Sequence, residues 1–217
     1  MMKRISALVL FVLIMEGAVY ASPVTGSRHD MSRFIANATS TTACVYCHSP
    51  HSNDAAAPLW NHALSSATYA IYQSPTIQGK TGQPGELSKA CLSCHDGTVA
   101  INAVMTAPAD GSLGDVPAAG RGSLFMNAAD DKNAYIGTDL SNDHPVSISY
   151  RPDLDKYLRK NAGAEVSNGF IILPLYGASA PYTVECSSCH NVHDPANAPF
   201  LRVANTNSQL CLTCHLK

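Results

Sequence analysis

Hydrophobic and polar positions follow no long helical or strand period over most of this chain. The exception is the start, where an apolar run of eleven residues (5–15) follows Lys3 and Arg4. The segment Val19-Tyr20-Ala21 then offers a small-residue cleavage site. A short positive region, an apolar run and such a site are typical of a secretory signal peptide, with an uncleaved anchor as the alternative. We therefore expect residues 1–21 to be removed on export.

The mature chain predicts only short regular elements. Arg151–Lys160 is expected to form a short helix, because Pro152 suits a first helical turn. Phe170–Tyr176 is apolar enough for a strand, which Pro174 would confine to a sheet edge. Thr183–Glu185 is a candidate to pair with that strand. No mature segment approaches the roughly 18 apolar residues that a membrane span needs, so we expect no span.

An internal repeat divides the mature chain into two modules. The string CVYCHSPHSNDAAAPL aligns with CSSCHNVHDPANAPF, and SKACLSCH parallels SQLCLTCH. The stretch Asp96–Asn142 is rich in Gly, Ala, Asp and Pro, and it is expected to be loop. We predict one domain, 22–217, built of modules at about 22–105 and about 140–217, joined by this loop-rich connection. The expected fold class is mostly irregular and coil-rich, with a few short helices and a small β-hairpin.

All eight cysteines fall in four copies of the pattern C-x-x-C-H, and none is left over. Eight cysteines in an exported protein first suggest disulfides, but disulfides do not require a histidine after every second cysteine. This spacing is the signature of c-type haem attachment, in which two thiols bond the porphyrin and the histidine binds its iron. The expected thioether residues are Cys44, Cys47, Cys91, Cys94, Cys186, Cys189, Cys211 and Cys214, and the expected proximal iron ligands are His48, His95, His190 and His215.

The sequence thus predicts four haem c groups, with structural zinc as the competing interpretation. Paired CxxC units also form zinc sites, but zinc does not account for the four adjacent histidines. The whole chain has 14 basic and 16 acidic residues, so no basic excess indicates a nucleic-acid partner.

Five further histidines could supply the second axial ligands: His29, His51, His62, His144 and His193. A catalytic haem keeps one iron position open for substrate, whereas a haem with two histidine ligands is closed and transfers electrons. Because the supply of histidines exceeds the demand of four irons, we expect four closed irons. The chemistry predicted is electron transfer, and the chain is not expected to be an enzyme.

His51 and His193 each lie three residues after a proximal histidine. Axial ligands sit on opposite faces of a porphyrin, with their nitrogens about 4 Å apart through the metal. So short a tether cannot easily place both ligands on one iron. If His51 and His193 are ligands, each must therefore reach the iron of a different motif, which would bring two haems into contact.

The other distal ligands are less sharply defined by the sequence. His144 precedes Pro145, which favours an extended backbone for a ligand. His29 and His62 compete for the last position, and spacing alone does not choose between them. The methionines lie in no recognisable ligand context: Met31, Met105 and Met126.

Four haems leave about 49 mature residues for each cofactor, too few to build a separate core of ordinary size. We expect the haem stack to be the core and the polypeptide to be its coat. Iron and thioether bonds then contribute folding free energy, so the haem-free chain is expected to be unfolded.

The motifs HDMS, CVYCHSPH, APLWN, CLSCHDGTVA, SNDHPVS, VECSSCH and CLTCH run through most of the mature chain. They resemble those of the multihaem cytochromes with paired CxxCH motifs from metal-reducing bacteria, and most closely those of the extracellular, filament-forming tetrahaem type. This resemblance implies histidine ligation on both faces of every haem and favours His29 over His62. It also allows one distal ligand, His29, to come from a neighbouring subunit of a head-to-tail homopolymer.

The resemblance therefore implies an extracellular or cell-surface electron conduit. Its expected partners are redox proteins and an electron acceptor outside the cell or in the periplasm. The alternatives are a soluble periplasmic tetrahaem carrier and, less favoured, a multihaem reductase with one open haem.

Overall fold

The structure is a computed structural model that describes residues 24–39, 43–49, 59–116, 124–129 and 131–216. The predicted signal peptide and the candidate ligand His51 lie outside these residues. In the described part of the chain, no helix is long and apolar enough to cross a membrane.

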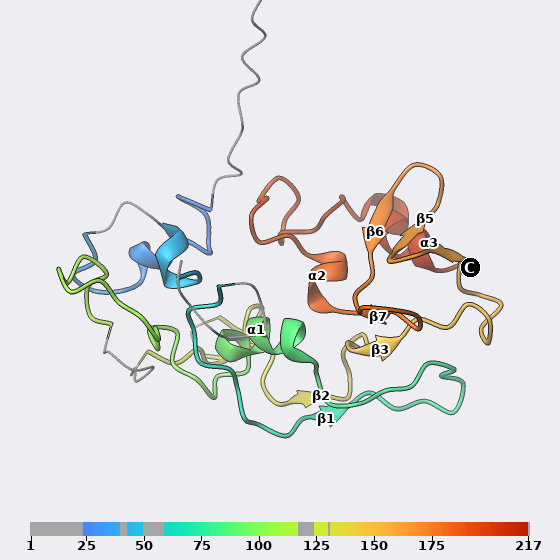
Figure 1. Cartoon of the computed structure of the whole chain (residues 1–217), viewed down its shortest axis with the longest axis horizontal. Helices are drawn as coiled ribbons and strands as arrows, with labels where there is room; N and C mark the ends of the chain where they lie inside the picture. Colours follow the sequence, from blue (N-terminus) through green and yellow to red (C-terminus); the bar gives the residue numbers. More distant parts are fainter. Residues whose placement is uncertain (1–23, 40–42, 50–58, 117–123, 130, 217) are drawn as a thin grey trace, which may run out of the picture.

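Regular structure is sparse, which confirms the predicted coil-rich class (Figure 1). The helices are α1 (Glu86–His95), α2 (Cys186–Cys189) and α3 (Gln209–Cys214), with 3-10 turns η1 (Met31–Arg33), η2 (Ala43–Tyr46) and η3 (Thr206–Ser208). The strands are β1 (Ala70–Ile71), β2 (Asp139–Leu140), β3 (Ile148–Ser149), β4 (Asn161–Ala162), β5 (Glu165–Ser167), β6 (Ile172–Pro174) and β7 (Thr183–Val184).

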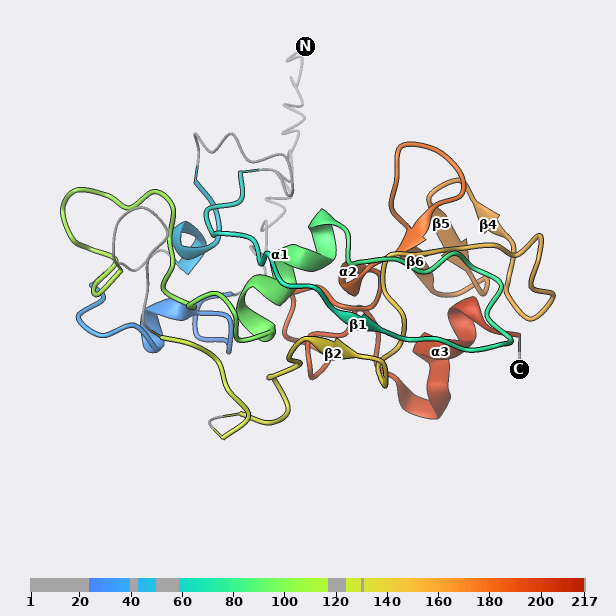
Figure 2. The same ribbon diagram turned by 90° about the horizontal axis from the view of Figure 1, so that it is seen from below.

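The strands form three small sheets. Strands β1 and β2 pair in parallel, β3 and β7 pair antiparallel, and β4, β5 and β6 form an antiparallel meander in that order. Figure 2 shows the meander beside α3 at one end of the molecule. Strand β6 is an edge strand that contains Pro174, as predicted, because proline cannot donate to a further strand.

Helix α1 shows why a C-x-x-C-H motif folds locally as it does. It begins after Gly85, carries Glu86 in its first turn and His95 in its last, and ends at Asp96. An acidic first turn and a basic last turn suit the helix dipole. The Asp96 carboxylate then accepts hydrogen bonds from the backbone N–H of Thr98 at 2.7 Å and from its hydroxyl at 2.8 Å, which turns the chain away from the helix.

The buried apolar residues form three separate small clusters. The first holds Ile35, Tyr46, Val104 and Leu113, the second Tyr150, Val166, Leu173 and Leu175, and the third Tyr69, Leu92 and Leu140. Each cluster packs around a different part of the chain. Clusters of this size are small beside the single core of an ordinary domain of this length.

The helix predicted for residues 151–160 is wrong, because this segment forms turns. The Asp155 carboxylate accepts a hydrogen bond from the N–H of Tyr157 at 2.9 Å, and Asp153 pairs with Arg151 at 2.6 Å. Such local side-chain bonds compete with helical hydrogen bonds. The pairing predicted for residues 183–185 is partly right: Thr183 forms one bridge with Tyr176, while the strand that contains it pairs with β3.

Candidate haem-binding sites

Each C-x-x-C-H motif occupies about one helical turn. The N–H of the histidine bonds to the carbonyl of the first cysteine at 2.8 Å for His48, 3.0 Å for His190 and 2.9 Å for His215. His95 lies inside α1, at its last position. One turn of this kind presents both thiols and the imidazole on neighbouring parts of the same loop, as a covalently attached haem requires.

The segment after each turn is fixed by backbone pairing in three of the motifs. Isolated antiparallel bridges join His48 to Trp60, His190 to Leu201 and His215 to Leu158. The proximal histidines are therefore held by strand-like contacts to segments 10 to 60 residues away, and their orientation does not depend on the helix alone.

Three candidate distal histidines face proximal histidines of this chain. The ring centroids of His29 and His95 are 6.1 Å apart. Those of His48 and His193 are also 6.1 Å apart, and those of His144 and His215 are 6.3 Å apart. An iron held between two imidazole nitrogens at about 2 Å each puts the ring centroids about 6.3 Å apart. The spacing of all three pairs therefore fits an iron bound on both faces.

The other ring nitrogen of several histidines is engaged by a backbone carbonyl. His95 Nδ1 donates to the carbonyl of Ala134 at 2.7 Å, and His190 Nδ1 donates to that of Pro199 at 3.0 Å. His144 Nδ1 likewise donates to the carbonyl of Pro145 at 3.1 Å. Such a bond fixes the tautomer and leaves Nε2 as the basic nitrogen that binds a metal.

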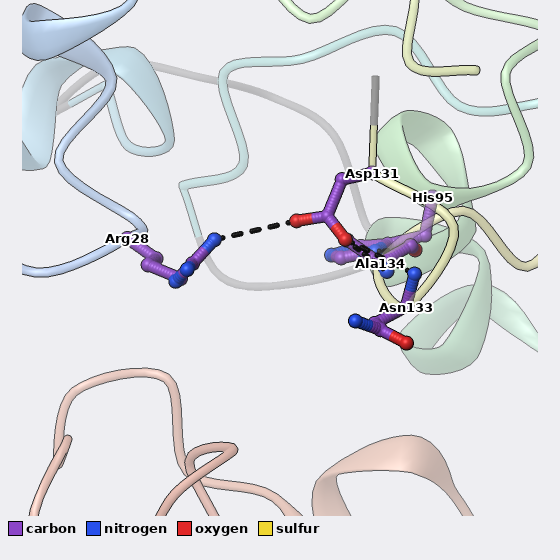
Figure 3. A network of polar contacts seen from close by, with 5 residues as sticks. All are labelled: Arg28, His95, Asp131, Asn133 and Ala134. Carbon is purple, nitrogen blue, oxygen red and sulfur yellow. Dashed lines mark hydrogen bonds and ion pairs between the residues drawn. The ribbon is translucent and has the colours of Figure 1, made fainter. Parts of the chain in front are cut away.

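The carbonyl that orients His95 belongs to a loop that Asp131 organises (Figure 3). The Asp131 carboxylate accepts hydrogen bonds from the N–H groups of Asn133 at 3.0 Å and Ala134 at 3.2 Å. Arg28, next to His29, forms an ion pair with the same carboxylate at 3.3 Å. One loop therefore contacts His95 and also Arg28, the residue that precedes His29.

The environment of His29 favours a neutral imidazole. Burial is the main cause that lowers the pKa of His29 to about 4, and the nearby His95 adds to the effect. Its ring meets Phe200 edge-on at 4.4 Å, and its Nδ1 is buried without a hydrogen-bond partner in the described part of the chain. A neutral imidazole is the form that ligates iron.

His62, the alternative distal ligand, lies in a different setting. It is 2 % exposed, its Nε2 lies 2.9 Å from the carbonyl oxygen of Ala100, and its Nδ1 lies 3.1 Å from that of Ala63. Both ring nitrogens therefore lie within hydrogen-bond distance of backbone carbonyls, and a neutral ring, which has one N–H, donates to one of them at a time. Its neighbour Asn61 donates to the carbonyls of Val45 and Thr106, so this segment ties the first motif to the loop that follows the second.

The thiols of the motifs lie in different environments. Burial raises the pKa of Cys47 to about 11 and that of Cys94 and Cys214 to about 12, whereas a hydrogen bond with Cys91 lowers the pKa of Cys186. Among the residues described by the structure, no group of three or more Cys, His, Asp or Glu side chains could hold a metal ion.

One buried polar residue escaped the sequence-based prediction. Glu185, directly before the third motif, is 5 % exposed and accepts hydrogen bonds from several hydroxyl groups. A glutamate before a cysteine is an unremarkable local pattern, and its bonding partners come from segments up to 97 residues away. No sequence signal would have found it.

Comparison with known proteins bears on the last part of the chain. A family model described as the doubled CXXCH motif matches residues 180–217, which carry the third and fourth motifs. No curated protein matches the chain. The doubled motif is that of multihaem c-type cytochromes, and its CXXCH units imply covalent binding of haem c and a role in electron transfer.

Proposed function

We propose that this protein is a tetrahaem cytochrome that transfers electrons through four covalently attached haems with histidine ligands on both faces. The observation that carries the proposal is the common 6.1–6.3 Å spacing of three histidine pairs from distant parts of the chain. When bound, each haem supplies a reversible one-electron couple of its iron. The polypeptide fixes the axial imidazoles, attaches the porphyrins and restricts the access of water.

Within this proposal, His29, His193 and His144 are the distal ligands for the second, first and fourth motifs. The proximal His190 of the third motif is then left without a distal ligand. His51, which corresponds to His193 in the first repeat, would supply it. The first and third motifs would then exchange distal ligands reciprocally, because His193 already faces His48. An exchange of this kind follows from the internal repeat and would keep the two haems adjacent.

We further propose that the protein is exported and acts as an extracellular electron conduit, and that it polymerises into a filament. This finer proposal is supported by the resemblance of its motifs to those of filament-forming cytochromes. The contact between His29 and His95 within one chain supports a ligand set that is complete without a neighbouring subunit. Electron microscopy of secreted material decides between a filament and a soluble periplasmic carrier.

The test of the proposed function is a measurement of haem content and spin state on the purified mature protein. We expect four covalent haems by pyridine haemochrome assay and mass spectrometry, low-spin optical and paramagnetic-resonance spectra, and no binding of carbon monoxide. A high-spin haem that binds carbon monoxide stoichiometrically would favour the reductase alternative. A chain without covalent haem would refute the proposal.

A matched pair of variants tests the ligand assignment itself. His193→Ala should convert one haem to a high-spin form that binds carbon monoxide, because His193 faces the proximal His48. His62→Ala should leave all haems low-spin, because both ring nitrogens of His62 lie beside backbone carbonyls. The reverse result would assign the distal role to His62.

A further inference from the structure

The second and third motifs meet at the boundary between the two repeats. Helices α1 and α2 lie side by side near the middle of the molecule (Figure 1). The N–H of Cys186 lies 3.3 Å from the hydroxyl of Ser88, and the side chains of Cys91 and Cys186 interact directly. The two porphyrins attached at these cysteines would therefore approach each other here.

The side chain of Glu185 occupies this boundary. Its Oε2 accepts hydrogen bonds from the hydroxyls of Ser88 in α1 and, at 2.8 Å, of Ser147. Its Oε1 accepts a hydrogen bond at 2.7 Å from the hydroxyl of Thr183 in β7. The side chain also caps the N–H of Ser188 in α2. One carboxylate thus joins its own stretch, residues 183–188, to α1 and to Ser147.

Hydrogen-bond donors surround the side chain of Glu185. A carboxylate has enough acceptor positions to accept a bond from each of them. The carboxylate also lies near the N-terminus of α1, because Oε1 would be 3.8 Å from a Cβ at Gly85, the N-cap of that helix. Helix N-termini stabilise negative charge.

In the described part of the chain, Glu185 forms no ion pair. The two ion pairs found among the described residues are Arg28–Asp131 and Arg151–Asp153, and neither involves Glu185. With Glu185 only 5 % exposed and Ser88 fully buried, water screens the charge weakly. A buried negative charge next to a redox centre stabilises the oxidised state, because oxidation adds a positive charge to the iron.

We propose that Glu185 is a buried negative charge that joins the second and third haem-binding motifs and lowers the reduction potentials of the haems attached at Cys91 and Cys186. The inference rests on the proposed function, since it needs haems at both motifs. Glu185 does not contact iron and acts as a positioning residue. Its charge would set the driving force for electrons that cross from one repeat to the other.

The decisive variant is Glu185→Gln, which keeps the shape and removes the charge, while the surrounding hydroxyls can rotate to suit an amide. Spectroelectrochemical titration should show part of the redox curve shifted to higher potential. Glu86→Gln is the matched control, because Glu86 lies in the first turn of α1 but is exposed to solvent. Its titration curve should coincide with that of the wild type.

A second variant gives the opposite expected sign. Thr183→Val removes one donor to the carboxylate but keeps its charge and the β-branched shape that suits strand β7. The less compensated charge should shift the same part of the curve to lower potential. Shifts of both variants in the same direction, or an unchanged Glu185→Gln curve, would overturn the inference and leave Glu185 a purely structural residue.

The outcomes separate the inference from the proposed function. If the wild type carries no covalent haem, the proposed function fails. If the wild type carries its haems and the variants titrate like it, only the inference fails. If Glu185→Gln does not mature, Thr183→Val decides alone: a lowered potential supports the role of the charge, and an unchanged or raised potential refutes it.

Discussion

The His29–His95 pair and the His144–His215 pair have almost the same ring separation, 6.1 and 6.3 Å, in very different surroundings. His29 is largely enclosed and packs against Phe200 at 4.4 Å, whereas His144 is exposed. In these two pairs the fold keeps the ring separation nearly constant and varies the environment. Burial and solvent access are among the factors that set the potential of a haem, so the two sites should differ in potential although their proposed ligands are the same.

The largest effect should come from removing all haem, which tests whether the polypeptide holds either pair by itself. Replacing all eight cysteines with serine prevents attachment at every motif. Since the buried apolar residues form only small separate clusters, we expect the variant to lose the cooperative melt of the holoprotein in calorimetry and most of its helical circular dichroism. Native-like helix content with a cooperative melt would show that the chain forms the pairs without haem.

The next largest effect should distinguish the His29–His95 pair from the His144–His215 pair. His29→Ala and His144→Ala each remove one proposed distal ligand and should each give one high-spin haem. His29→Ala also removes a ring that packs against Phe200, so its loss of unfolding free energy should be larger by about 1–3 kcal/mol. Denaturant titration of both holoproteins measures the difference. Equal losses would mean that the enclosed environment of His29 contributes nothing to stability.

The residues that directly follow the two proximal histidines offer a smaller, matched test. Asp96 is 2 % exposed and accepts hydrogen bonds from Thr98 and from the hydroxyl of Tyr69, whereas Leu216 is 49 % exposed. Asp96→Ala leaves buried donors without an acceptor and should cost about 2 kcal/mol of unfolding free energy. Leu216→Ala should change it by less than about 0.5 kcal/mol. Chemical denaturation checks both, and similar costs would contradict the structural contrast.

The sequence reveals the chemistry of these sites better than their assembly. C-x-x-C-H is a local constraint, so all four motifs can be identified from spacing alone. The short tether of His193 to His190 indicates that His193 must face another motif, but not which one. In the structure the ring of His193 lies 6.1 Å from that of His48, which is 145 residues away. The sequence around His193 gives no sign of this long-range contact.

The fold shows the same limit. The apolar run Phe170–Tyr176, which contains Pro174, predicts an edge strand, because apolar pattern and proline chemistry are local. The helix expected after Pro152 is absent, because the carboxylates of Asp153 and Asp155 bond within the turn and outweigh a weak propensity. Glu185 is the extreme case, since its role depends on three segments that are distant in sequence and meet at one carboxylate.

The smallest effect should come from the ion pair beside the enclosed site. Arg28 and Asp131 lie 3.3 Å apart, with side chains 83 % and 35 % exposed. Exposed pairs contribute about 0–1 kcal/mol, so Arg28→Ala should leave stability nearly unchanged, and Arg151→Ala, in the other repeat, should behave alike. Asp131→Ala should cost more than Arg28→Ala, about 1 kcal/mol, because Asp131 also holds the N–H groups of Asn133 and Ala134.

The paramagnetic-resonance spectrum separates two roles of Asp131: its ion pair with Arg28 and the hydrogen bonds that hold its own loop. Loss of the loop should loosen the carbonyl of Ala134 that binds His95 Nδ1, and so change the paramagnetic-resonance signal of one low-spin haem. Arg28→Ala removes the ion pair but keeps the loop, so its signal should match that of the wild type. If both variants perturb the signal equally, then the charge pair, and not the loop hydrogen bonds, orients the enclosed site.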